Sequence, residues 1–175
     1  MKSIFTLAAI LFTSLLFAQT TFDKFDGQDD ITSIIVNKKM FDLMSKVKME
    51  ASDKEAQQYL KLIKKLDNLR VFTTTSLRAA SEMKASATSY MKMGGLEELM
   101  RVNDSGKNIK IMVKSGSTDT QIRELLMFIE GSGKGNQTVL MSLIGDFDLN
   151  EISVLTDRMK IPGGDDLKKA TKVKK

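Results

Sequence analysis

The sequence predicts a single α+β domain in which helices pack on one face of a mostly antiparallel sheet. The β-branched runs at 31–36 and 69–75 are typical of strands. Amphipathic segments with helix-capping residues surround these two strands, whereas the strands of the second half follow one another directly. Strands that cluster in this way, instead of alternating strictly with helices, indicate an α+β fold.

The first element after residue 19 is expected to be a loosely held arm, because residues 20–30 are polar and acidic. The strand at 31–36 follows, and Asn37 then stands where a helix N-cap would be. Apolar residues continue at helical spacing, which predicts a helix with a buried stripe of Met40, Leu43, Met44 and Val47 beside Phe41.

Two further helices are predicted on either side of the strand at 69–75. Ser52 and Glu55 match an S-x-x-E capping box, and the apolar stripe behind them consists of Ala56, Tyr59, Leu60 and Ile63. Ser76 is the expected cap of the next helix, whose stripe consists of Ala80, Met83, Ala87 and Tyr90. Gly94 and Gly95 end this helix, since glycine is common just past a helix C-terminus.

The second half begins with a predicted hairpin, 96–103 paired with 109–114, around a turn that contains Asp104 and Gly106. A strand at 138–144 is followed by a helix that starts at Asp148 and Glu151 and ends before Pro162. Its buried stripe is expected to be Ile152, Leu155 and Met159.

Residues 122–130 fit two structures. Their apolar residues suit a helix that is capped by Thr118 and Gln121, and they equally suit a strand joined to 138–144 by the glycine-rich loop 131–136. We favour the strand, because 138–144 is a clear strand and needs a neighbour. The loop resembles a phosphate-binding loop only superficially, since Gly135 replaces the required Ser or Thr after Lys134 and no helix follows.

The N-terminus has the layout of a secretory signal peptide. Lys2 precedes an apolar run, and small residues around Ala18-Gln19 provide a cleavage site. We therefore expect residues 1–19 to be removed and the protein to be exported to the periplasm or the extracellular space. The apolar run is shorter than a membrane-spanning helix requires, and no Cys is present to carry a lipoprotein anchor.

The predicted domain spans 20–162, and 163–175 is predicted to be a basic, flexible tail. The whole chain has a net charge of +5, but residues 20–167 carry 21 Lys and Arg against 22 Asp and Glu. The positive charge is therefore concentrated at the C-terminus, which predicts contact with a polyanion such as anionic lipid or glycan. The residues expected to make it are Lys168, Lys169, Lys172, Lys174 and Lys175.

Composition excludes several kinds of chemistry. The chain has no His, no Cys and no Trp. It therefore has no Ser-His-Asp triad, no thiol nucleophile, no disulfide and no zinc site of His and Cys ligands. We expect no cofactor and no metal. Nucleic acid is not an expected partner, because no aromatic platform accompanies the basic residues.

Methionines and acidic clusters are the remaining candidates. Most of the 12 methionines fall on predicted apolar faces, but Met91 and Met93 precede a glycine pair and are expected to form an adaptable partner surface. The acidic clusters are better explained by turns and helix caps than by catalysis. They comprise Asp26, Asp29 and Asp30, then Asp146 and Asp148, and finally Asp165 and Asp166.

Four segments, 31–44, 69–76, 95–114 and 138–155, resemble the domain of unknown function 4252, a family of small exported proteins of the Bacteroidetes. The resemblance covers roughly residues 20–160. It implies an α+β fold, no assigned activity, and a link through gene context to envelope-stress signalling. Many relatives carry a lipoprotein cysteine, which this chain lacks.

Three functions remain open from the sequence. The first is a non-catalytic interaction or binding module of the cell envelope, with an unknown protein or envelope component as its partner. The second is a hydrolase or lyase that uses carboxylates, in which Asp146, Glu151 or another acid would converge with Lys or Arg in a pocket. The third is a surface-attached protein that is held through its basic tail.

Overall fold

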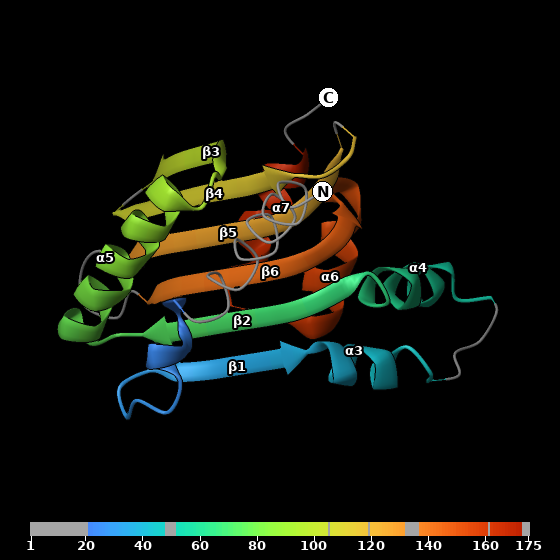
Figure 1. Cartoon of the computed structure of the whole chain (residues 1–175), viewed down its shortest axis with the longest axis horizontal. Coiled ribbons are helices and arrows are strands. Elements are labelled where there is room, and N and C mark those ends of the chain that lie inside the picture. Colours follow the sequence, from blue (N-terminus) through green and yellow to red (C-terminus); the bar gives the residue numbers. More distant parts are fainter. Residues whose placement is uncertain are drawn as a thin grey trace, which may run out of the picture.

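The computed structural model describes residues 21–47, 52–104, 106–118, 120–131, 137–160 and 162–172. Within these ranges the predicted α+β class is confirmed (Figure 1). The elements in chain order are η1 (Asp23–Phe25), β1 (Thr32–Asn37), α3 (Lys38–Met44), α4 (Lys54–Ile63), β2 (Leu66–Thr74), α5 (Leu77–Met93), β3 (Glu97–Asp104), β4 (Lys107–Ser115), β5 (Gln121–Gly131), β6 (Thr138–Asp148), η2 (Leu149–Glu151), α6 (Ile152–Met159) and α7 (Gly164–Lys172).

The six strands form one open antiparallel sheet in the order β1-β2-β6-β5-β4-β3. The strand interpretation of residues 122–130 is confirmed, because they lie within β5, which pairs with both β4 and β6. The glycine-rich loop falls largely outside the described residues. This strand order leaves β1 and β3 at the two edges of the sheet.

Helices cover both faces of the sheet, which differs from the prediction of helices on one face. One apolar cluster joins the sheet to α3, α4, α6 and α7, and a second joins the opposite face to α5 and the N-terminal segment. Figure 1 shows α5 and the blue N-terminal segment in front of the sheet and α6 and α7 behind it. Neighbouring residues of one strand, such as Met127 and Phe128, enter opposite clusters. Such continuous apolar runs are typical of strands that are buried on both faces.

The N-terminal segment is firmly packed, so the prediction of a loosely held arm was wrong. Phe22 and Phe25 are fully buried. The Phe22 ring meets the ring of Tyr90 edge-on at 5.2 Å, and Phe25 meets Phe72 at 5.7 Å. Aromatic pairs in this geometry are favourable. These contacts hold the segment that leads into β1 against the sheet.

The predicted buried stripe of α3 was also wrong. Asn37 caps the helix as expected, since its Oδ1 accepts a hydrogen bond from Met40 N at 3.0 Å. However, Phe41 is the buried residue, with Met44 partly buried beside it. The apolar residues left at least half exposed are Met40, Leu43 and Val47. The reason is that α3 lies at the end of the edge strand and only one side of the helix meets the core.

The other helices begin at the predicted capping residues, with one exception. Asp53, not Ser52, caps α4, because its Oδ1 accepts from Ala56 N. Ser76 caps α5, and Asp148 with Glu151 forms a reciprocal capping box at the start of η2. A carboxylate near a helix N-terminus is stabilised by the helix dipole as well as by this hydrogen bond.

The C-terminal segment does not begin as an extended tail at residue 163. Residues 164–172 form α7, which packs on α6, and Leu167 is fully buried in the core. This single apolar side chain anchors an otherwise polar helix, because burying a leucine stabilises a fold by roughly 1.5–3 kcal/mol. Residues 173–175 lie outside the described part of the chain.

Candidate functional site

The two methionines predicted to form a partner surface, Met91 and Met93, both lie at the end of α5 but differ in exposure. Met93 is 76% exposed at the end of α5. Met91 packs partly buried against the second apolar cluster and lines a small cavity with Phe128. The partner surface therefore stays a prediction.

The basic residues predicted to contact a polyanion are placed only in part. Lys168 is half-buried on α7. Lys169 and Lys172 belong to the same helix, but their side chains lie outside what the structure describes, as do Lys174 and Lys175 altogether. The polyanion contact therefore stays a prediction.

Five of the seven large apolar side chains that are exposed among the described residues lie at the β1 end of the sheet. Ile34 is 39% exposed and Ile35 is 41% exposed, although both belong to a strand. Met40 and Leu43 of α3, and Val47 just after this helix, are exposed as well. We call this set, Ile34, Ile35, Met40, Leu43 and Val47, the β1 edge surface. Exposed apolar groups of this kind often mark an interaction site.

The backbone of β1 is also available for pairing. β1 pairs in uninterrupted register with β2 on its inner side, and its six residues, TSIIVN, include no charge. No described strand pairs with its outer side. An edge strand with free N–H and C=O groups is a template for another strand unless charge, proline or a bulge prevents it. β1 has none of these three protections.

The opposite edge strand, β3, is protected. Four of its eight residues are charged, and its register with β4 shifts between Glu98 and Met100. Glu98 and Arg101 also form an ion pair on its surface. Charges and bulges both discourage strand addition. The molecule therefore presents one open and one closed edge.

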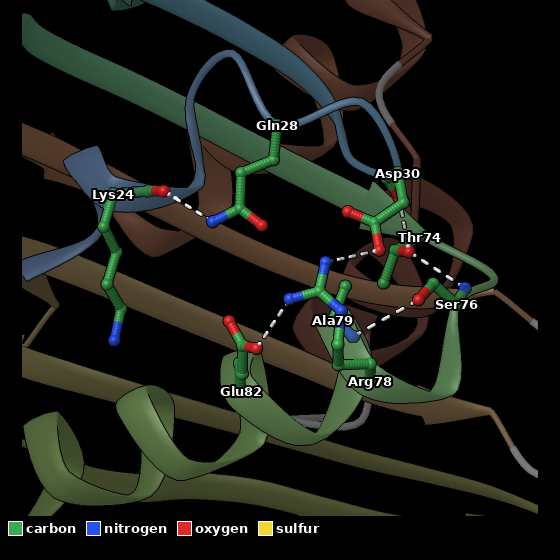
Figure 2. Close-up of polar contacts among 8 residues, drawn as sticks. All are labelled: Lys24, Gln28, Asp30, Thr74, Ser76, Arg78, Ala79 and Glu82. Atoms are coloured by element: carbon green, nitrogen blue, oxygen red, sulfur yellow. Dashed lines mark hydrogen bonds and ion pairs between the residues drawn. The ribbon is translucent and has the colours of Figure 1, made fainter.

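The chain before β1 is fixed by a polar network, which Figure 2 shows. Thr74 Oγ1 donates to the backbone oxygen of Asp30 at 2.6 Å, and the Asp30 carboxylate forms an ion pair with Arg78 at 3.1 Å. A hydrogen bond from the Ser76 side chain, together with the charge of Arg78, holds the pKa of the Asp30 carboxyl below its usual value. The start of β1 is thus tied to the first turn of α5.

A second polar pair lies buried between α5 and the sheet. Tyr90 Oη donates to Glu124 Oε1 at 2.8 Å, and both residues are less than a tenth exposed. Burial raises the pKa of the Glu124 carboxyl, and the Tyr90 hydrogen bond and the Lys114 charge only partly oppose this effect. Burial also raises the pKa of the Tyr90 hydroxyl. No local pattern in the sequence predicts this pair, because the two residues are 34 positions apart.

The acidic residues considered for catalysis gather at an open pocket of about 630 Å³ near the ends of β2 and β6. Asp146 and Asp148 line it with Lys64, Lys65 and Asp67. Glu151 is bound to Lys65 at 2.8 Å rather than free. Burial acts to raise the pKa of Asp148, but hydrogen bonds from Asn150 and Thr120 hold it below its usual value. A general acid needs the opposite shift, so the geometry favours a structural role for Asp148.

The described residues lack two further features. They contain no group of three or more acidic residues arranged to hold a metal ion. None of their helices is both long and apolar enough to cross a membrane.

The fold defines this chain as a small α+β domain with an open sheet edge. Comparison with protein families then places it: residues 25–155 match the family "Domain of unknown function (DUF4252)", and the protein belongs to that family. The resemblance expected from the sequence is thereby confirmed. No curated protein and no solved structure matches the chain.

Proposed function

We propose that this protein is an exported, non-catalytic interaction module of the cell envelope, which binds an extended segment of a partner along the outer side of β1. The observation that supports this function is the contrast between the two sheet edges. Strand addition would extend the sheet by backbone hydrogen bonds, and pockets for alternate side chains would supply specificity.

The chemistry of the β1 edge surface suits this mode of binding. Ile34 and Ile35 are consecutive residues of a strand and therefore point to opposite faces of the sheet. Their partners on β2, Val71 and Arg70, also point to opposite faces. An added strand would therefore cover one isoleucine on each face. Burying an isoleucine stabilises an interface by up to roughly 1.5–3 kcal/mol.

Catalysis is less well supported than binding. Three charged residues of the pocket near β6 are already engaged: Asp148 in a helix cap, Asp67 in an ion pair with Lys38, and Lys65 in an ion pair with Glu151. The acid with a raised pKa, Glu124, is buried under α5 rather than placed in that pocket. The proposed export follows from the sequence of residues 1–19.

Position-specific photocrosslinking in the producing cells tests the proposal. A photoreactive amino acid would replace Thr32, which is exposed on β1, or Asn103, which is exposed on β3. We expect a discrete adduct from position 32 only, and we expect its loss when Ile34→Lys is added. Equal adducts from both positions, or none from position 32, would refute binding through β1.

Mass spectrometry of the protein from the envelope fraction tests the export. The mature protein is expected to begin near Gln19. Recovery of the uncleaved chain from the cytoplasm would contradict this part of the proposal.

A further inference from the structure

The charges that flank β1 reverse in sign about Ile34. Asp29 and Asp30 precede Ile34 by five and four residues, and Lys38 and Lys39 follow it by four and five residues. The order is acidic, apolar, basic. Such a segment is complementary to itself when two copies run antiparallel, because the acidic end of each lies beside the basic end of the other.

Two of these four charges are already used within the chain. Asp30 pairs with Arg78, and Lys38 lies within 4 Å of Asp42 and Asp67 and donates to the backbone oxygens of Lys64 and Leu66. The other two, Asp29 and Lys39, are exposed. Neither forms an ion pair with any residue in the described ranges. Asp29 and Lys39 are therefore the pair available for a contact between chains.

The faces of the sheet restrict how two copies of β1 can pair. Thr32, Ile34 and Val36 face the cluster under α3 and α4, whereas Ser33 and Ile35 face the other side. A two-fold axis perpendicular to the sheet keeps each side chain on its own face. The axis must then lie midway between two copies of the same residue, so the central registers are those centred on Ile34 and on Ile35.

The charges select between the two registers. Centring on Ile34 places Ile34 opposite its own copy and Ser33 opposite Ile35. Because β1 spans Thr32–Asn37, the turn before β1 of each copy, which contains Asp29, then meets the start of α3 of the other, which contains Lys39. Centring on Ile35 instead places Lys38, the first residue of α3, opposite Thr32, so the acidic and basic flanks are offset by two residues. The first register therefore aligns the opposite charges of the two flanks.

We propose that the occupant of the β1 edge is a second copy of this chain, paired antiparallel about Ile34 so that two six-stranded sheets join into one. This inference rests on the proposed function, because it names the partner of the same edge. The resulting dimer has a closed two-fold symmetry and uses up both open edges. Its outer edges are then the two charged β3 strands.

A charge exchange tests the contact between Asp29 and Lys39. Asp29→Lys or Lys39→Asp places like charges together at both ends of the interface, and each is expected to weaken dimerisation roughly tenfold. The double variant Asp29→Lys/Lys39→Asp restores opposite charges and is expected to bind within roughly threefold of the unchanged protein. Lys92→Asp, an exposed charge on α5, is the matched control and should leave dimerisation unchanged. Sedimentation velocity at several protein concentrations measures the dissociation constant.

Single cysteines test the register, and the chain has no Cys to interfere. Directly opposed residues of an antiparallel pair have Cα atoms about 4.5–5.5 Å apart, within the range that a disulfide spans. Ile34→Cys is therefore expected to form a dimer-mass disulfide rapidly under mild oxidation. Ile35→Cys is expected to stay reduced, because its two copies lie diagonally and beyond the roughly 7 Å limit. Asn103→Cys on β3 is the control.

The outcomes separate this inference from the proposed function. A monomer at all concentrations, or additive losses without rescue in the double variant, overturns the self-paired dimer. A fast disulfide from Ile35→Cys in place of Ile34→Cys overturns the register. If the dimer fails while position 32 still crosslinks to a different protein, the interaction module stands and its partner is that protein. If neither contact forms, both are rejected.

Discussion

The two edge strands of this sheet are built differently. β1 is short, uncharged and regular in register, and its exposed apolar side chains are isoleucines. β3 is longer, half charged and shifted in register. A single sheet therefore carries one edge that resists strand addition and one that accepts it. The difference suggests that the open edge of β1 is a feature of function and not of the fold class.

The segments that lead into the two edges also differ in how they are fixed. The approach to β1 is held by buried aromatic rings. The approach to β3 follows α5, whose Tyr90 donates a buried hydrogen bond to Glu124 of β5. Apolar contacts do not depend on pH, whereas a buried carboxyl does. The stability of the two sides should therefore respond to different changes.

The largest effect is expected from Phe25→Ala, which removes the ring that packs on Phe72. Deleting a fully buried phenylalanine usually destabilises a protein by about 3–5 kcal/mol. Leu99→Ala on β3 removes a partly buried side chain and is expected to lower the free energy of unfolding by less, about 1–2 kcal/mol. Urea denaturation gives both values. Similar losses in the two variants would show that the N-terminal segment is not the main anchor of β1.

A smaller effect, which depends on pH, is expected from Glu124→Gln. Because the folded-state pKa of Glu124 is raised, the folded protein holds its proton where the unfolded chain has lost it. The free energy of unfolding therefore falls as the pH rises from the pKa of Glu124 in the unfolded chain to its higher pKa in the folded protein. Glutamine cannot ionise and still accepts the Tyr90 hydrogen bond, so the variant should lack this fall.

The relative stability of Glu124→Gln should thus increase with pH, by up to about 1–3 kcal/mol for a buried polar group. Glu130→Gln on the same strand is the control, because Glu130 is partly exposed and pairs with Lys84. Thermal unfolding across the acidic to neutral range measures both variants. A constant difference between Glu124→Gln and the unchanged protein would contradict a buried ionisable group.

A loss of about 1 kcal/mol is expected from Asn37→Ala, the typical value for removing a helix N-cap. Asn37 is both the last residue of β1 and the cap of α3, so the change loosens the junction on which the β1 edge surface depends. Asn37→Asp keeps an acceptor for Met40 N and should retain most of the stability. If both variants lose stability equally, the cap is not the reason.

These residues also show what could be predicted from the sequence. The caps Asn37 and Ser76 were predictable, because each depends on neighbours within a few residues. The strand β5 was predictable only because the clear strand at 138–144 needs a partner. The burial of Phe25, Phe41 and Leu167 was not, since it depends on partners far along the chain. A short helix can carry apolar residues on more than one side, and tertiary packing then decides which side is buried.

The candidate site was missed for the same reason. Ile34 and Ile35 read as ordinary core residues of a strand, and nothing local shows that β1 lies at an edge. Strand order is a property of the whole sheet. The sequence does show that the strand TSIIVN has no charge and that the strand EELMRVND is half charged. This difference points to an interaction site only when both strands are known to be edges of the sheet.

The smallest change in stability, and the sharpest test of the comparison, is expected from making β3 resemble β1. The double variant Glu98→Thr/Arg101→Thr removes an exposed ion pair, so the free energy of unfolding should change by at most about 1 kcal/mol. In an Ile34→Lys background, where association through β1 is blocked, new concentration-dependent association should appear by sedimentation velocity if charge is what closes β3. If the protein stays monomeric, the register shift between Glu98 and Met100 is sufficient to close that edge without the charges. The open state of β1 would then follow from its regular backbone, with its lack of charge a secondary feature.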